Sequence, residues 1–275
     1  AVKNDLGKVV YEICTDYRDL EQFYKSKYCQ AFLNKAFYER LISAISNEAV
    51  CLIIGTPCVL SGIKNTLLAQ KAKLTSCIFV DLVCHGVMSQ SVYHTHLEEC
   101  KKRWGGVVTQ HYFRYKRAVT KDCPEGSHWN LYKVNNEIII KKSDDDYYMQ
   151  TYFADLAMRE TCYCCQFTGT NRIGDITIGD FNNAHILCSQ FDGLRSVSLV
   201  LVNTDKGQRF IDECNNNTVN LQPVDIKLLQ KFNTPLTAPI KRPFQRSLFY
   251  TFYNSLGLSR TVSFCLLYTS PSPRD

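Results

Sequence analysis

The chain has 275 residues, of which 45% are hydrophobic and 21% are charged, and its formal net charge is +6. This is the composition of an ordinary globular protein that can bury a sizeable core. The positive charge is spread out, and short basic runs such as residues 101–103 contain no interleaved aromatic side chains. We therefore expect no nucleic-acid partner.

Fourteen cysteines are many for a chain of this length. Disulfide frameworks suit short secreted chains that begin with a signal peptide, and residues 1–8 contain no apolar segment of that kind. No stretch of the sequence approaches the roughly 20 apolar residues that span a bilayer. These patterns predict a cytoplasmic protein without a membrane span, in which clustered cysteines serve metal or redox chemistry.

The two ends of the chain indicate an N-terminally truncated fragment. There is no initiator methionine, and apolar residues 9–14 close to the start predict an element whose partners lie upstream. Residues 266–275 resemble the conceptual translation of a sequencing adapter, so we interpret them as a non-native tail. We divide the remainder into an α/β domain over residues 1–235 and a helical extension over residues 236–265.

Strands and helices alternate in the first part of the chain. An apolar run over residues 49–54 predicts a buried strand, and residues 60–71 have the apolar spacing of a helix. Residues 76–83 predict a second strand and residues 92–104 a second helix. Strand–helix–strand–helix is a βαβ unit, which requires a mainly parallel sheet covered by helices.

Residues 107–142 change character, because short alternating runs are split by a Cys-Pro-Glu-Gly-Ser segment at residues 123–127. This pattern predicts an antiparallel hairpin inserted after the βαβ unit. The later elements that we predict are a helix over 147–159, strands over 176–181 and 196–203, a helix beginning at 209 and a helix over 244–257. The predicted fold class is therefore α/β, with a mainly parallel sheet, flanking helices and an inserted antiparallel hairpin.

Three cysteine-containing strings carry the chemistry. Cys58 follows a Gly-Thr-Pro turn at the start of a helix, and Cys84 ends the next strand, so both belong to the carboxyl edge of a parallel sheet. Cys162 and Cys165 form a C-x-x-C pair. Four thiols are the number that an iron–sulfur cluster or a zinc ion requires, and thiolates accept either. The cysteines outside these strings show no ligand spacing, so we predict that they pack in the interior.

Two other functions remain open at this point. A structural zinc protein would use the same thiols without catalysis, although a zinc ribbon would contain a second C-x-x-C pair. A cysteine hydrolase with Cys58 as the nucleophile and His85 as the base would leave the other cysteines unused. A phosphate-binding P-loop is rejected, because the spacing between Gly55 and Gly62 is too long.

The combination of strings is more specific than any one of them. The strings are Ser26-Lys27-Tyr28, Gly55-Thr56-Pro57-Cys58 with Gly62, Asp81 to Val87 with Ser89, Phe113-Arg114 with Lys116, Cys162-x-x-Cys165, Arg172-x-Gly174-Asp175-Ile176, Gly179-Asp180-Phe181, and Ser196-Val197-Ser198 to Thr204. In this order they resemble the C-terminal domain of the coenzyme F-420 hydrogenase/dehydrogenase beta-subunit family. The resemblance extends from about Asp19 to Gly207.

The resemblance implies an oxidoreductase that carries FAD and a [4Fe–4S] cluster. Such a protein passes electrons between a ferredoxin-type donor, or a ferredoxin domain missing from this N-terminus, and a small-molecule hydride acceptor such as the deazaflavin coenzyme F-420. The implied cluster ligands are Cys58, Cys84, Cys162 and Cys165. The implied cofactor contacts are Ser26, Lys27, Tyr28, Gly55, Thr56, Pro57, Gly86, Arg172, Asp175 and Asp180. The candidate catalytic residues are His85 and Lys27.

Overall fold

The computed structural model describes residues 2–5, 8–115, 129–181, 184, 197–214 and 219–267. The chain divides into two compact units, which we describe separately. Unit 1 contains residues 33–85 and 164–240, and unit 2 contains residues 2–32, 86–163 and the chain from residue 241 onward. The domain boundaries at residues 235 and 265 stay a prediction.

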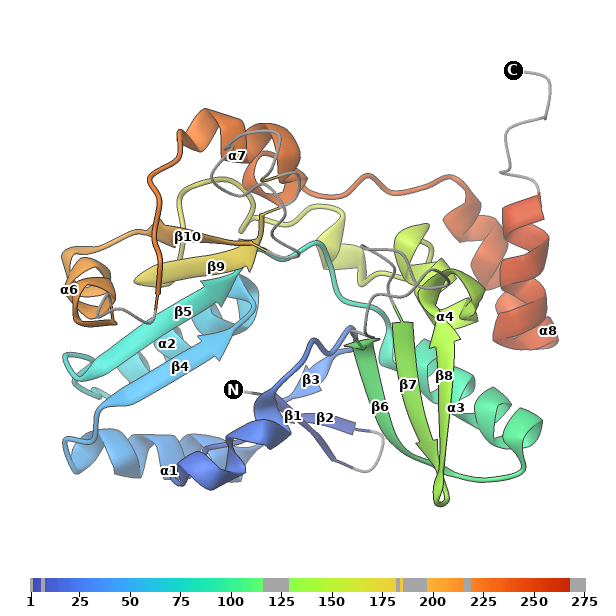
Figure 1. Ribbon diagram of the computed structural model, residues 1–275, viewed down its shortest axis with the longest axis horizontal. Helices are drawn as coiled ribbons and strands as arrows, with labels where there is room; N and C mark the ends of the chain where they lie inside the picture. The colour runs from blue at the N-terminus through green and yellow to red at the C-terminus, as the bar shows by residue number, and fades with distance from the viewer. Residues whose placement is uncertain are drawn as a thin grey trace. The chain divides into compact units, whose positions relative to one another are not determined.

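Unit 1 contains a four-stranded sheet with the strand order β10-β9-β5-β4, which Figure 1 shows side by side. Its strands are β4 (Cys51–Gly55), β5 (Cys77–Leu82), β9 (Ile176–Asp180) and β10 (Ser198–Val202). β4 and β9 both run parallel to β5, and only the edge strand β10 is antiparallel. The predicted mainly parallel sheet is therefore confirmed, and three strands end at one edge.

The helices that the structure describes in unit 1 are α1 (Lys35–Ser46), α2 (Pro57–Ala69), α6 (Asp205–Cys214) and α7 (Ile226–Phe232). α2 lies close to the span predicted for it and α6 begins before the predicted residue 209, whereas α1 and α7 were not predicted. α2 packs against β4 and β5 through Leu60, Ile63 and Leu67, which are completely buried. Pro57 occupies its first turn, where a missing backbone N–H costs nothing. This β4–α2–β5 arrangement places the residues that follow β4 and β5 at the same sheet edge.

Unit 2 contains two small sheets. The first has the order β1-β2-β3, with strands Val2–Asp5, Lys8–Tyr11 and Ala31–Phe32. The second is an antiparallel meander of β6 (Val108–Tyr115), β7 (Trp129–Val134) and β8 (Glu137–Lys142). The predicted hairpin is thus a three-stranded sheet, because its second alternating run folds back on itself at the turn before Glu137. The predicted break at residues 123–127 lies outside the described residues.

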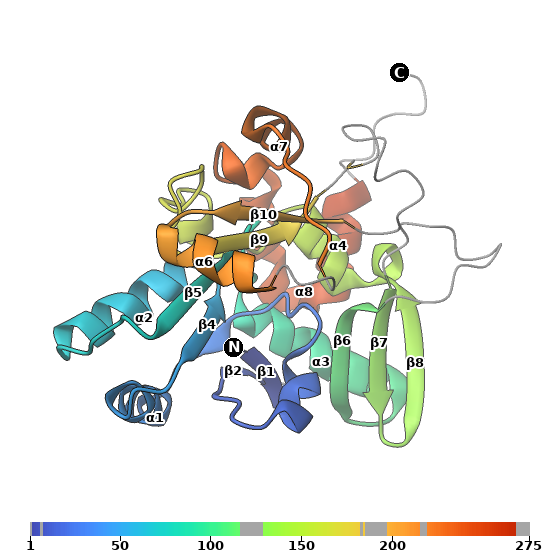
Figure 2. The same cartoon turned by 60° about the vertical axis from the view of Figure 1, so that its left-hand side comes forward.

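Helix α3 (Gln90–Trp104) belongs to unit 2 and not to the parallel sheet that it was expected to cover. It packs against β6, α4 (Tyr147–Phe153) and α8 (Gln245–Leu267), and Figures 1 and 2 both show it behind the meander strands. The physical reason is the wide aromatic face of α3. Tyr93 on this face is buried against rings of the meander and α4, which offer larger apolar partners than a short parallel sheet.

The long helix α8 is broken at Gly257, whose φ angle of 77° is outside the helical range. Glu99 of α3 accepts hydrogen bonds from the backbone amides of Leu258 and Ser259, so its carboxylate caps the second half of α8. Within the described part of the chain, no helix combines the length and the apolar character needed to cross a membrane.

The packing of α6 in unit 1 depends on the absence of a side chain at Gly207. A Cβ atom at this position would overlap the carbonyl group of Asp175. We expect Gly207→Ala to lower the free energy of unfolding by about 1–3 kcal/mol, because either α6 or the backbone at Asp175 must shift to relieve the overlap.

Gly62→Ala in α2 is the matched control, since no atom lies within 4 Å of a Cβ at Gly62. That change should stabilise the protein by about 0.5–1 kcal/mol through helix propensity. Urea unfolding of both variants measures the difference. Equal effects of the two substitutions would show that the close approach at Gly207 is unimportant.

Candidate functional site

The candidate site of unit 1 is the edge at which β4, β5 and β9 end. Gly55 of β4 pairs with Asp81 of β5, and Cys58 and Cys84 each lie the same number of residues beyond this pair. Cys58 is exposed and Cys84 is half-buried. Asp180, which ends β9, is exposed at the same edge. Ligands of open α/β sheets bind at this edge, outside the carboxyl ends of the strands.

The position of Cys58 is set by the start of α2. Thr56 is the N-cap residue, with extended backbone angles, and its carbonyl accepts hydrogen bonds from the amides of Val59 and Leu60. The Thr56 hydroxyl lies 3.6 Å from the Cys58 sulfur. The thiol therefore lies in the first turn of α2, at the helix end where backbone N–H groups have no partner within the helix.

A buried ion pair lies directly beneath this edge. The Asp81 side chain is 0% exposed and the Arg172 side chain is 1% exposed. Arg172 donates to Asp81 Oδ1 through Nη2 at 2.7 Å and through Nε at 3.1 Å. The other oxygen, Oδ2, accepts from the backbone amides of Ile173 and Gly174. Four donors surround the carboxylate, which is the condition for burying a charge at low cost.

Arg172 also donates hydrogen bonds to backbone carbonyls in two separate segments of unit 1. Its guanidinium donates to the carbonyl of Leu82, two residues before Cys84. It donates further to the carbonyls of Phe167 and Gly169, shortly after Cys165. One side chain therefore holds the end of β5 and the loop after Cys165 together within unit 1.

Asp175 has a second set of contacts in unit 1. Its carboxylate accepts from the Phe79 amide at 2.9 Å and from the Thr204 hydroxyl at 2.8 Å, and it lies 3.2 Å from Lys206 Nζ. The motif around Gly174 that contains Arg172 and Asp175 is thus anchored to β5 by both of its charges. Contact of either residue with a cofactor stays a prediction.

No role was predicted for Asp81, although it begins the string from Asp81 to Val87. The available signal was a single carboxylate within the otherwise apolar strand β5. A charge at such a position needs a cationic partner, and Arg172 is separated from it by 91 positions in the sequence.

Cys162 lies in unit 2, in the short 3-10 helix Glu160–Cys162. Here another arginine holds the backbone, because Arg246 donates to Glu160 at 3.0 Å and to the carbonyl of Leu156 at 2.9 Å. Its guanidinium also lies 5.0 Å from the ring centre of Tyr163. The C-x-x-C segment therefore begins in unit 2 and ends in unit 1. Arg246 holds the backbone next to Cys162, and Arg172 holds the loop after Cys165.

The candidate cysteines are thus distributed over both units, with Cys58, Cys84 and Cys165 in unit 1 and Cys162 in unit 2. In the part of the chain that the structure describes, no group of three or more His, Cys, Asp or Glu side chains is arranged to hold a metal ion. Thiol chemistry suits an iron–sulfur cluster or zinc, but the described arrangement does not by itself fit either.

The candidate catalytic residues also lie in different units. His85 is exposed in unit 1, three residues beyond β5. Lys27 is half-buried in unit 2, where its ammonium donates to the carbonyls of Phe23 and Tyr24. Burial lowers the pKa of Lys27 to about 8. Tyr28 next to it accepts a hydrogen bond at its carbonyl from the hydroxyl of Tyr148.

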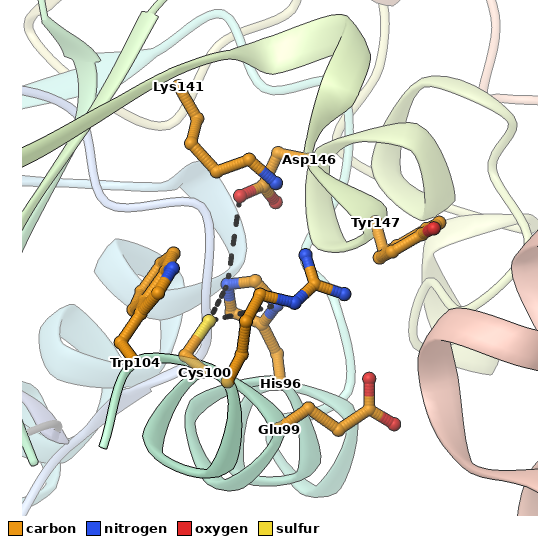
Figure 3. Close-up of a pocket in the computed structure, with 8 residues that line it drawn as sticks. His96, Glu99, Cys100, Trp104, Lys141, Asp146 and Tyr147 are labelled. Atoms are coloured by element: carbon orange, nitrogen blue, oxygen red, sulfur yellow. Dashed lines mark hydrogen bonds and ion pairs between the residues drawn. The ribbon is translucent and has the colours of Figure 1, made fainter. Parts of the chain in front are cut away.

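Unit 2 contains a small pocket with a volume of about 10 Å³, which is room for about one water molecule. Its lining residues are His96, Glu99, Cys100, Arg103, Trp104, Lys141, Asp146 and Tyr147 (Figure 3). The Cys100 sulfur lies 3.6 Å from His96 Nε2, and an Asp146 oxygen lies 3.9 Å from the same nitrogen. A nucleophile–base–carboxylate triad would use both ring nitrogens. Burial also raises the pKa of Cys100 to about 12, so this cluster is no cysteine nucleophile.

Around this pocket, buried polar groups form a network. Tyr132 donates to Asp146 at 2.5 Å, and its hydroxyl is 2.9 Å from His96 Nε2. His111 contacts the Tyr93 hydroxyl through Nδ1 at 3.2 Å. Burial lowers the pKa of His96, and it lowers the pKa of His111 to about 3. Both imidazoles are therefore neutral in the folded protein near neutral pH.

The buried ion pair generates the first prediction for the site. We expect Arg172→Gln to lower the free energy of unfolding by about 3–5 kcal/mol, because Asp81 would remain buried without its cation. Arg172→Lys keeps the positive charge but loses the second hydrogen bond to Asp81. It should therefore lower the free energy of unfolding by less than Arg172→Gln does.

The control is Arg242→Gln, which removes an exposed pair with Glu160 whose side chains are 54% and 62% exposed. This change should lower the free energy of unfolding by less than about 1 kcal/mol. Urea unfolding measures all three variants. Similar losses for Arg172→Gln and Arg242→Gln would contradict a structural role of the buried pair.

The neutral histidines make the stability of the folded protein depend on pH. An unfolded histidine has a pKa of about 6.5, whereas His111 in the folded protein has one of about 3. As the pH falls from the first value to the second, the unfolded chain binds a proton that the folded chain does not, so stability falls.

The slope of the free energy of unfolding against pH measures this effect. We expect His111→Gln to reduce that slope by up to about 1.4 kcal/mol per pH unit. The control is His94→Gln, since His94 is exposed on α3. Unfolding free energies from urea titrations at several pH values give the slopes. An unchanged slope in the His111 variant would mean that this imidazole does not resist protonation.

The family model that describes the C terminus of the coenzyme F420 hydrogenase/dehydrogenase beta subunit matches residues 49–227. This span contains β4, β5 and β9, and it includes Cys58, Cys84, Asp81 and Arg172. A comparison with curated proteins found no match. The chain therefore belongs to the coenzyme F-420 hydrogenase/dehydrogenase beta-subunit family, through that family's C-terminal region.

Proposed function

We propose that this chain is part of a flavin- and iron–sulfur-dependent oxidoreductase that passes electrons between a ferredoxin-type donor and a small-molecule hydride acceptor. The observation that carries the proposal is the pair Cys58 and Cys84, which follow adjacent parallel strands to one sheet edge. Membership of the family supports the redox reaction and coenzyme F-420 as one candidate acceptor. Adjacent strand ends are where this class of fold binds its ligands.

The proposed cofactors are FAD and a [4Fe–4S] cluster, which when bound supply hydride transfer and one-electron transfer. The proposed cluster ligands are Cys58, Cys84, Cys162 and Cys165. Their support is the preference of iron–sulfur clusters for thiolates and the family membership of the chain. Within the described residues no complete ligand set is grouped, and substitution of single cysteines tests the proposed roles.

The residues of the chain have separate proposed tasks. Gly55, Thr56 and Pro57 form the turn into α2, whose backbone amides point along the helix axis and suit a phosphate group. Arg172 and Asp175 hold the loop after Cys165 on β5. The residues proposed to surround the flavin are Ser26, Lys27, Tyr28, Gly86 and Asp180.

Lys27 and His85 are the proposed proton-handling groups. With its pKa lowered to about 8, Lys27 releases a proton more readily near neutral pH than an ordinary lysine does. Its two hydrogen bonds to backbone carbonyls hold the ammonium at a defined position. The proposed setting is the cytoplasm, where thiol ligands stay reduced.

Purification under anaerobic conditions, followed by assays for iron, sulfide, zinc and flavin, tests this proposal. A brown protein is expected, with a broad visible absorption band that bleaches with dithionite. Iron and sulfide should be present in similar amounts. A colourless, folded protein with stoichiometric zinc and no flavin would instead indicate a structural zinc protein.

Substitution of single cysteines locates the cluster within the same experiment. Cys58→Ser and Cys84→Ser should each lose most of the bound iron, because each removes one proposed ligand. Cys214→Ser, at the end of α6, is the control and should keep it. Circular dichroism verifies that each variant is folded. Equal iron loss in all three variants would reveal general destabilisation and no specific site.

A further inference from the structure

A second pair of cysteines lies at the opposite ends of the same two strands. Cys51 and Cys77 are the first residues of β4 and β5, and they are direct partners in the parallel register. The amide of Cys51 donates to the carbonyl of Ser76 at 3.0 Å, which holds the strand starts together. Neighbouring strands are about 4.8 Å apart, within the Cα separation of about 4.4–6.8 Å that disulfides bridge.

The two thiols interact with each other. They share a hydrogen bond, and the Cys51 thiol also lies 3.5 Å from the carbonyl of Ala49, to which it donates. A hydrogen-bond contact between the side chains of two paired residues brings the thiols close enough for a disulfide to form between them.

The two cysteines differ in their access to solvent. Cys77 is completely buried, whereas Cys51 is half-buried. Burial raises the pKa of Cys77 to about 11. Burial also raises the pKa of Cys51, but the hydrogen bond from Cys77 opposes this rise. Cys51 is thus the thiol that a reagent in solution reaches first, and Cys77 is the thiol behind it.

We propose that Cys51 and Cys77 form a reversible disulfide when the protein meets a low-molecular-weight disulfide such as oxidised glutathione. Cys51 loses its proton to solvent, and its sulfur attacks the reagent, whose S–S bond breaks with release of one thiol. The sulfur of Cys77 then loses its proton and attacks the Cys51 sulfur, which releases the second thiol. Two protein thiols are oxidised, and one reagent disulfide is reduced to two thiols.

This modification site is independent of the proposed function. Cys51 and Cys77 begin the strands, whereas Cys58 and Cys84 follow their carboxyl ends. The disulfide would close a loop that contains β4 and α2, which constrains the unfolded chain and raises the melting temperature. The bond would therefore stabilise the scaffold beneath the candidate site without using its thiols.

The test treats the full chain with oxidised glutathione under native conditions, blocks the remaining thiols and maps disulfides by mass spectrometry after proteolysis. We expect a peptide pair that links Cys51 to Cys77 and is lighter than the two reduced peptides by two hydrogen atoms. Dithiothreitol should reverse the link. The oxidised protein should melt several degrees higher than the reduced protein.

Single substitutions separate the two steps. In Cys77→Ser the reaction should stop at a glutathione adduct on Cys51, and in Cys51→Ser the buried Cys77 should stay reduced. Cys214→Ser should form the link as the unaltered protein does.

Three results would overturn the proposal, and all can be read from the unaltered protein. They are accumulation of the glutathione adduct on Cys51 without a link, linkage of Cys51 to a different cysteine, and unreactive thiols in a folded protein whose urea-unfolded form reacts.

Discussion

The buried pair of Asp81 and Arg172 is the interaction on which the candidate site depends. Asp81 is buried in β5, an inner strand of the sheet, where an unpaired carboxylate would be strongly destabilising. Arg172 resolves this and at the same time binds carbonyls on β5 and on the loop after Cys165. Arg246 has a similar task in unit 2, where it holds the backbone next to Cys162 through Glu160. Two largely buried arginine side chains thus hold the chain next to the two ends of the C-x-x-C segment.

Strands β4 and β5 carry cysteines at both of their ends. The pair Cys58 and Cys84 lies beyond the carboxyl ends and is accessible to ligands, in the place where α/β sheets bind them. The pair Cys51 and Cys77 lies at the amino ends, and its thiols share a hydrogen bond. Because the strands are parallel and in register, residues at equivalent positions become neighbours without any local sequence signal.

Much of the fold could be predicted from apolar patterns. The strands of unit 1 and helix α2 have strong periodicity and clear turn residues, and they form where the pattern places them. Helix α3 was predicted as an element, but its packing in unit 2 was not. An amphipathic pattern specifies that a face is buried and leaves open which partner buries it. That choice depends on aromatic side chains such as Tyr93 and on long-range packing energies.

For the candidate site, the sequence by itself determined the identity and order of the thiols, the shared edge of Cys58 and Cys84, and the family resemblance. Each of these depends on local spacing or on the direction of strands, which are properties of a pattern. Only the tertiary structure decided that Arg172 and Asp175 bind other parts of the chain, that Cys51 and Cys77 are paired neighbours, and that the imidazoles of His96 and His111 in unit 2 are buried and neutral. These are consequences of burial and of contacts between residues far apart in the chain, where the free energy of desolvation selects the partners.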